Sequence, residues 1–108
     1  MRIKAKTFRA WMRANFTKGQ LRDMTEHGVD TGWHGLTYYS DTCKLYERFK
    51  DEIWAKLAED AESMGEPTPV HMLATFKGIE HVQDATNFEN LLVWYMAETV
   101  AREIMDTE

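Results

Sequence analysis

Leu91-Leu92-Val93-Trp94-Tyr95-Met96-Ala97 is the stretch that decides the fold, because it is the longest apolar run in the chain. Seven residues make almost two turns of a helix, so this run is apolar around the whole helix circumference. It is far shorter than the roughly 20 residues that cross a membrane. A helix without a polar face is either central in its fold or shared with a partner. We expect one of these two positions for it.

Capping signals delimit the other helices around this run. Ser40 can cap a long helix that Gly65 ends, and Thr86-Asn87-Phe88-Glu89 matches the capping box that begins a last helix. Thr7 and the capping box Thr17-Lys18-Gly19-Gln20 begin two shorter helices. Together with a Thr68-Pro69 start, these signals predict helices over about 8–15, 18–27, 41–64, 69–75 and 87–106.

The long third helix has a clear apolar stripe. At 3.6 residues per turn the stripe comprises Tyr46, Phe49, Ile53, Leu57, Ala61 and Met64. The opposite face comprises Lys44, Arg48, Asp51, Ala55, Glu59 and Glu62. We therefore predict an all-α fold: one domain over residues 1–108, a compact bundle of four to five helices with long third and C-terminal helices. Residues 1–6 are expected to form an extended basic arm.

Composition places the chain among cytoplasmic proteins. A chain of 108 residues with 44% hydrophobic residues can bury one core. The single cysteine excludes an internal disulfide and favours a reducing compartment. Arg9 and Arg13 stand where a signal peptide would need apolar residues, so we expect no secretion and no membrane contact.

Residues that could carry chemistry do not form a recognisable catalytic pattern. No two of the four histidines have helical ligand spacing, and Cys43 has no cysteine partner, so we expect no metal site. Cys43 is placed at the edge of the core, where a thiol is inert. Asp23 and His27 can meet one turn apart. Without a phosphate-binding loop or nucleophile elbow, we expect no catalytic residues and no cofactor.

Charge is distributed unevenly along the chain. The first 22 residues carry seven basic and no acidic residues, whereas residues 23–108 carry six basic and 18 acidic residues. Lys6, Arg9 and Arg13 fall on one side of the first helix, away from its apolar residues. They could contact nucleic acid, or they could pair with carboxylates of the third and last helices. The second interpretation is preferred because the chain itself supplies so many acidic partners.

The last helix has a second apolar side. Trp94 and Met105 lie opposite Val93, Ala97 and Val100 on the helical wheel. Such a helix can pack in both directions inside one fold, or it can present Trp94 and Met105 to a protein partner or a second copy in a homodimer. Both alternatives stay open at this point.

Three phrases resemble those of a small family of phage and prophage proteins of unknown function. They are Phe8-Arg9-Ala10-Trp11-Met12, Gly35-Leu36-Thr37-Tyr38-Tyr39-Ser40-Asp41-Thr42 and Asn90-Leu91-Leu92-Val93-Trp94-Tyr95. The resemblance spans most of the chain. It implies a bacterial or phage origin, a cytoplasmic location and an accessory role, and it carries over no functional residues.

We therefore expect a non-catalytic module that binds or regulates an unidentified protein partner. The absence of a catalytic pattern and the apolar circumference of the last helix favour this hypothesis. The first alternative is a nucleic-acid-binding module that uses the basic arm and the first helix. A small enzyme is a third hypothesis, which a deep pocket with converging titratable groups would favour.

Overall fold

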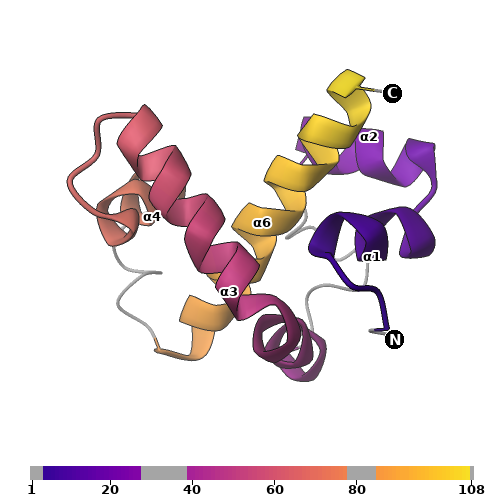
Figure 1. Ribbon diagram of the computed structural model, residues 1–108, viewed down its shortest axis with the longest axis horizontal. Coiled ribbons are helices and arrows are strands. Elements are labelled where there is room, and N and C mark those ends of the chain that lie inside the picture. The colour runs from indigo at the N-terminus through magenta and orange to yellow at the C-terminus, as the bar shows by residue number, and fades with distance from the viewer. Residues whose placement is uncertain (1–3, 28–38, 78–84, 108) are drawn as a thin grey trace.

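The computed structural model describes residues 4–27, 39–77 and 85–107. These residues form helices α1 (Phe8–Asn15), α2 (Lys18–His27), α3 (Tyr39–Ser63), α4 (Pro69–Lys77) and α6 (Ala85–Thr107), as Figure 1 shows, and they contain no strand. The predicted all-α fold with a long third and a long C-terminal helix is confirmed.

Helix α6 is central. It contacts α1, α2, α3 and α4, with α1 and α2 on one side and α4 with much of α3 on the other (Figure 1). Six residues of the run 91–97 are buried and Trp94 is partly buried. The apolar circumference of this helix is thus covered from several directions by the chain's own helices. Burying such side chains stabilises a fold by roughly 1.5–3 kcal/mol each.

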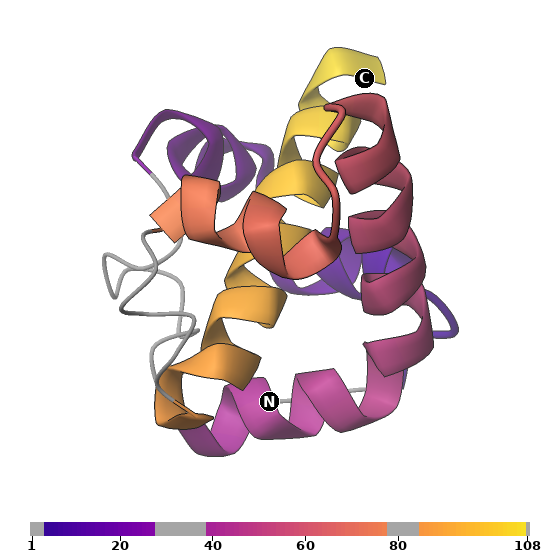
Figure 2. The ribbon, with the colours of Figure 1, turned by 90° about the vertical axis from the view of Figure 1, so that its left-hand side faces the viewer.

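Helix α3 is bent, which the sequence did not predict. Phe49 has non-helical dihedral angles (φ −121°, ψ 15°) and divides α3 into two arms. Figure 2 shows the first arm crossing the base of the molecule and the second rising beside α6. Neither proline nor glycine stands at the bend. The ring of Phe49 packs edge-on against the ring of Phe8, and the two ring centroids are 5.4 Å apart. Packing against a residue distant in the chain therefore accompanies the break in the helix.

The predicted stripe of α3 is confirmed in its middle and wrong at its end. Phe49, Ile53, Leu57 and Ala61 are buried. Met64 is 62% exposed because α3 ends at Ser63. There Gly65 takes a left-handed φ of 72° and the Glu66 amide donates to the Ala61 carbonyl at 2.9 Å. All six residues predicted for the opposite face are exposed.

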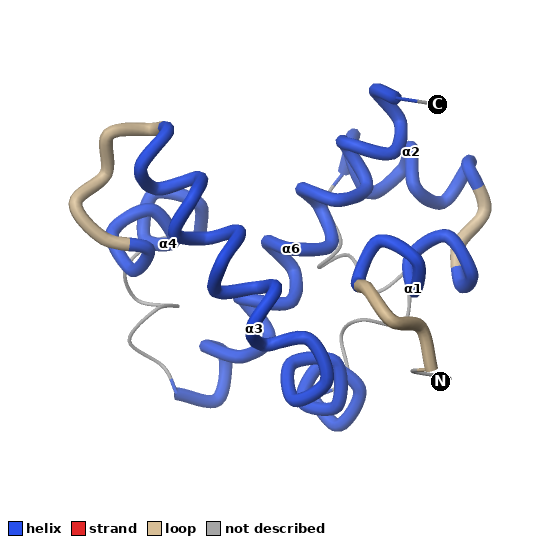
Figure 3. The backbone as a smooth tube through the Cα atoms, viewed as in Figure 1, coloured by secondary structure: helices blue, strands red, loops and turns tan. Residues whose placement is uncertain are grey.

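Local caps decide where the short helices begin. The Thr7 hydroxyl accepts a hydrogen bond from the Ala10 amide at 3.1 Å, as predicted. Thr17 and Gln20 form the reciprocal capping box, with bonds of 2.8 and 3.2 Å, and a short link joins α1 to α2 (Figure 3). The predicted Ser40 cap is wrong because α3 already begins at Tyr39.

Two other predictions concern the ends of elements. Helix α6 begins at Ala85 rather than at residue 87, and the side chains of residues 85–88, which include most of the predicted capping box, lie outside those described. Residues 1–3 of the predicted arm also lie outside the described residues. Residues 4–6 precede α1 without helical structure, and Ala5 packs against the core.

We expect alanine at Phe49 or Leu57 to cost about 2–5 kcal/mol of unfolding free energy, because each deletion removes apolar contacts and leaves a cavity. Phe49 is 2% and Leu57 0% exposed. As a control, Met64→Ala should change the free energy of unfolding by less than about 0.5 kcal/mol. Urea denaturation followed by circular dichroism measures all three. Losses below about 1 kcal/mol at both core positions would contradict the assigned core.

Candidate functional site

Helix α1 borders two surface hollows on its basic side. One, of about 500 Å³, is lined by Thr7, Arg9, Ala10, Arg13 and Ala14. The other, of about 310 Å³, lies between α1, α2 and α6 and is lined by Arg13, Phe16, Lys18, Leu21 and Ile104. Because Arg13 belongs to both, the two hollows are neighbours. We call these two hollows with their rims the α1–α2 face.

The structure brings two of the three predicted basic residues together. Arg9 and Arg13 are one turn apart on α1 and line the same hollow. Lys6 is exposed in the segment before α1 and is not among the residues that line either hollow. Lys18 adds a cation on the other side of Arg13, at the start of α2. Lys18 was not predicted as a site residue, because it belongs to a different helix from Arg9 and Arg13.

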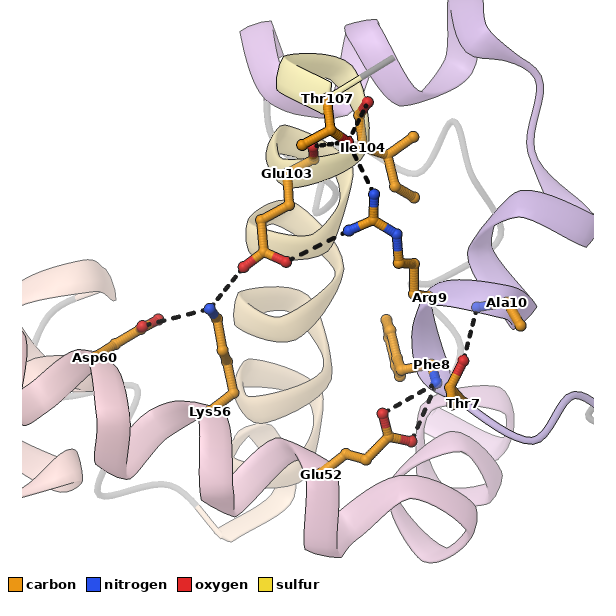
Figure 4. A network of polar contacts seen from close by, with 10 residues as sticks. All are labelled: Thr7, Phe8, Arg9, Ala10, Glu52, Lys56, Asp60, Glu103, Ile104 and Thr107. Carbon is orange, nitrogen blue, oxygen red and sulfur yellow. Dashed lines mark hydrogen bonds and ion pairs between the residues drawn. The ribbon is translucent and has the colours of Figure 1, made fainter.

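Part of the positive charge is matched within the chain (Figure 4). One guanidinium nitrogen of Arg9 lies 3.8 Å from Glu103 of α6, and the other donates to the Thr107 hydroxyl at 2.9 Å. Glu103 also pairs with Lys56 of α3 at 2.6 Å. Arg9 therefore shows the predicted pairing with the last helix, whereas the third helix joins this pair through the cation Lys56. Arg13 is exposed to solvent.

Contacts from the bend of α3 hold α1 in place. The Glu52 carboxylate accepts a hydrogen bond from the Phe8 amide at 3.1 Å, which places a negative charge at the positive end of α1. Arg48 donates to the Ala5 carbonyl at 2.9 Å. These bonds link residues more than 40 positions apart, so the sequence offered no local signal for them. They set the orientation in which α1 presents Arg9 and Arg13.

Comparison with known proteins identifies a family. A family model described as a domain of unknown function, DUF7222, matches residues 2–108. The chain belongs to the DUF7222 family. No curated protein and no solved structure matches the chain.

In this DUF7222 domain a polar cluster joins α3 to α6, and through Glu103 it continues to Arg9 of the α1–α2 face. Tyr95 of α6 donates to Asp60 of α3 at 2.6 Å, and Lys56 lies 3.6 Å from the same carboxylate. Burial and the bond to Asp60 raise the pKa of the Tyr95 phenol well above its usual value. The hydrogen bond with Glu103 raises the pKa of Lys56. Both groups therefore keep their protons at neutral pH, which suits structural hydrogen bonding and not a general base.

A buried polar contact that the sequence did not predict joins α3 to α6. The Thr42 hydroxyl donates to the Asn90 side-chain carbonyl, and both residues are buried where the first arm of α3 meets α6. Asn90 directly precedes the apolar run, which is the one signal that could have marked it. A satisfied buried pair of this kind specifies how two helices meet.

The remaining candidates form no chemical centre in the described parts of the chain. The predicted contact between Asp23 and His27 is present at 3.8 Å. Cys43 is partly buried. Within residues 4–27, 39–77 and 85–107 no cluster of histidine, cysteine and acidic residues could hold a metal ion. His34 and His81 lie outside these residues.

Trp94 and Met105, the predicted protein interface, are both partly buried and pack against the core. Neither residue belongs to the α1–α2 face. Their role at an interface stays a prediction. In the described portion of this DUF7222 domain, no helix has the length and apolar character needed to span a membrane.

We expect the unfolding free energy of the Tyr95→Phe variant to fall less steeply with rising pH, in alkaline solution, than that of the native protein. Folding raises the pKa of Tyr95, so the protonated phenol contributes to the free energy of unfolding. This contribution is fully present below the pKa of an unfolded tyrosine, about 10, and it declines as the pH rises toward the pKa in the folded protein. The native protein should therefore lose unfolding free energy faster than Tyr95→Phe between about pH 10 and 11.

Urea denaturation at pH 8, 10 and 11 measures this difference. At pH 8 the variant should be about 1 kcal/mol less stable, because it lacks the bond to Asp60. Lys56 is present in both proteins, so its own titration does not explain a difference. Parallel pH profiles would contradict the assigned role of the Tyr95 hydroxyl.

Proposed function

We propose that this protein is a non-catalytic module that binds a protein partner through the α1–α2 face. The observation that carries the proposal is the pair of hollows that meet at Arg13. Their linings combine cations with apolar side chains, namely Arg9, Arg13 and Lys18 with Phe16, Leu21 and Ile104. Protein interfaces typically pair an apolar centre with a charged rim, and arginine is enriched in them.

The neighbourhood of this face supports a protein over a nucleic acid. Arg9 is engaged by Glu103 and Thr107, which reduces its charge available to phosphates. Helix α2 carries Asp23 and Glu26 on its solvent-accessible surface, with side chains 38% and 59% exposed. Carboxylates on the second helix of a helix–turn–helix would repel the phosphates of duplex DNA.

We also propose that the module is of phage or prophage origin and acts in the bacterial cytoplasm as an accessory or regulatory protein. The resemblance of residues 8–12, 35–42 and 90–95 to phage and prophage proteins supports the origin. The single cysteine supports a reducing compartment. A homodimer or partner contact through Trp94 remains a further proposal, supported by the partial exposure of that side chain.

We expect affinity capture from a bacterial host lysate to recover a protein that survives nuclease treatment. Capture should be lost when Arg13→Glu and Lys18→Glu are combined, because the rim charge is reversed. Lys44→Glu makes the same kind of change on the exposed face of α3 and should leave capture intact.

Quantitative mass spectrometry of the captured material distinguishes the outcomes. If the double variant Arg13→Glu, Lys18→Glu captures a protein as well as Lys44→Glu does, that result would contradict binding of this protein through the α1–α2 face. Material that disappears with nuclease would favour the second candidate function, a nucleic-acid-binding module.

The second candidate is favoured by the hollow that Arg9 and Arg13 line together and by the exposure of Lys6. If these three cations each neutralise one phosphate, the affinity for duplex DNA should fall with salt at a log–log slope of about −2.7. We expect no such binding, because Arg9 pairs with Glu103 within the chain. Anisotropy of a labelled duplex at low salt measures it. Saturable binding with that slope, weakened by Arg13→Glu, would favour the nucleic-acid function.

A further inference from the structure

We infer that the hollow between α1, α2 and α6 is an anchor site for a partner segment in which an apolar side chain is flanked by aspartate or glutamate. The inference rests on the proposed function and specifies its ligand chemistry. The hollow is lined by Arg13, Phe16, Lys18, Leu21 and Ile104. The tertiary structure brings Ile104 of α6 against the other four, which lie within residues 13–21.

The floor of the hollow is apolar and rigid. Leu21 and Ile104 are each 2% exposed and belong to the core, so each is held by core packing and presents only a small part of its side chain to the hollow. Phe16 is partly buried and packs edge-on against Trp11, with ring centroids 5.4 Å apart. A volume of about 310 Å³ lies at the small end of ligand pockets and suits a single large side chain. Because Leu21 and Ile104 are already held in the core, a ligand side chain that contacts them does not have to order these two residues.

The rim of the hollow is positively charged. Arg13 of α1 and Lys18 of α2 are both exposed, and both line the hollow. The planar guanidinium of an arginine can bind a carboxylate through two hydrogen bonds, whereas the ammonium of a lysine acts as a point charge. An acidic residue on each side of the anchor would therefore match the rim. The capping box between Thr17 and Gln20 holds the start of α2, and with it the backbone of Lys18, in place.

The adjoining hollow extends the site along α1. Its floor includes Ala10 and Ala14, which are exposed and one turn apart, and it shares Arg13 with the anchor site. Small side chains allow a partner backbone to approach α1 closely. A segment anchored between α1 and α2 can thus continue over α1 toward Arg9. Residues 4–22 carry no acidic residue. Glu103 of α6 pairs with Arg9 and matches part of its charge, whereas Arg13 and Lys18 are exposed at the anchor site.

Synthetic peptides test the ligand chemistry directly. The probe is a short fluorescein-labelled peptide in which one leucine is flanked on both sides by glutamates. Two matched peptides replace the leucine by serine or the glutamates by glutamines, and a labelled duplex DNA serves as the nucleic-acid arm. Anisotropy gives the affinities, and methyl NMR spectra of the protein show which of Leu21 and Ile104 respond.

We expect the glutamate–leucine peptide to bind and to shift the methyl signals of Leu21 and Ile104. Arg13→Glu and Lys18→Glu should each lower its affinity by about tenfold, and Lys44→Glu by less than about twofold. Either matched peptide should bind at least about tenfold more weakly. Circular dichroism of each variant establishes that it is folded.

Three results would overturn the inference. They are equal binding of the serine peptide, unchanged Leu21 and Ile104 signals on saturation, or tighter binding of the DNA at the same salt. If lysate capture still depends on Arg13 and Lys18 in that case, the proposed function stands and only the ligand chemistry is wrong. If capture is independent of both residues, the proposed function itself fails, whatever the peptides do.

Discussion

An apolar helix has to be covered on every side, and the rest of this structure follows from that requirement. Helix α6 carries seven consecutive apolar residues, and water around them would cost roughly 1.5–3 kcal/mol for each large side chain left exposed. No single helix can cover a full circumference. The chain therefore places α1, α2, α3 and α4 around α6. The bend of α3 at Phe49 turns one arm across the base and leaves the other beside α6 (Figure 2).

This arrangement also determines where the basic N-terminal helices present their charge. Helices α1 and α2 bury Phe8, Trp11, Met12, Leu21 and Met24 toward the core, so their cations face outward. Bonds from Glu52 and Arg48 set the position of α1, and the Arg9–Glu103 pair ties it to the end of α6 (Figure 4). The hollow at Arg13 lies where three helices meet. The surface on which our functional proposal rests is therefore a product of the packing around α6.

The candidate site could be predicted only in part. Arg9 and Arg13 were identified because their spacing of four residues places them on one side of a helix. The pairing of such cations with the last helix was also predicted, whereas the partner Glu103 was not. Phe16 and Lys18 were missed because they lie just beyond the end of α1, where the spacing rule for one helix no longer applies. Ile104 was missed because it is remote in sequence, and no spacing signals its proximity. Met64 was wrongly assigned to the core. The helical wheel assumed that the helix includes Met64, whereas the turn around Gly65 follows directly after α3 ends at Ser63.

The sequence by itself determined much of the local structure: which segments are helical, which caps begin α1 and α2, and which faces are apolar. Those properties depend on interactions within one or two turns, such as the Thr7 cap and the Thr17–Gln20 box, and periodicity records them directly. Only the tertiary structure decided the bend at Phe49, the Tyr95–Asp60 bond and the hollow that joins α1, α2 and α6. Each of these depends on contacts between residues distant in the chain. Such contacts are selected by how whole helices cover one another, and no local pattern specifies that choice.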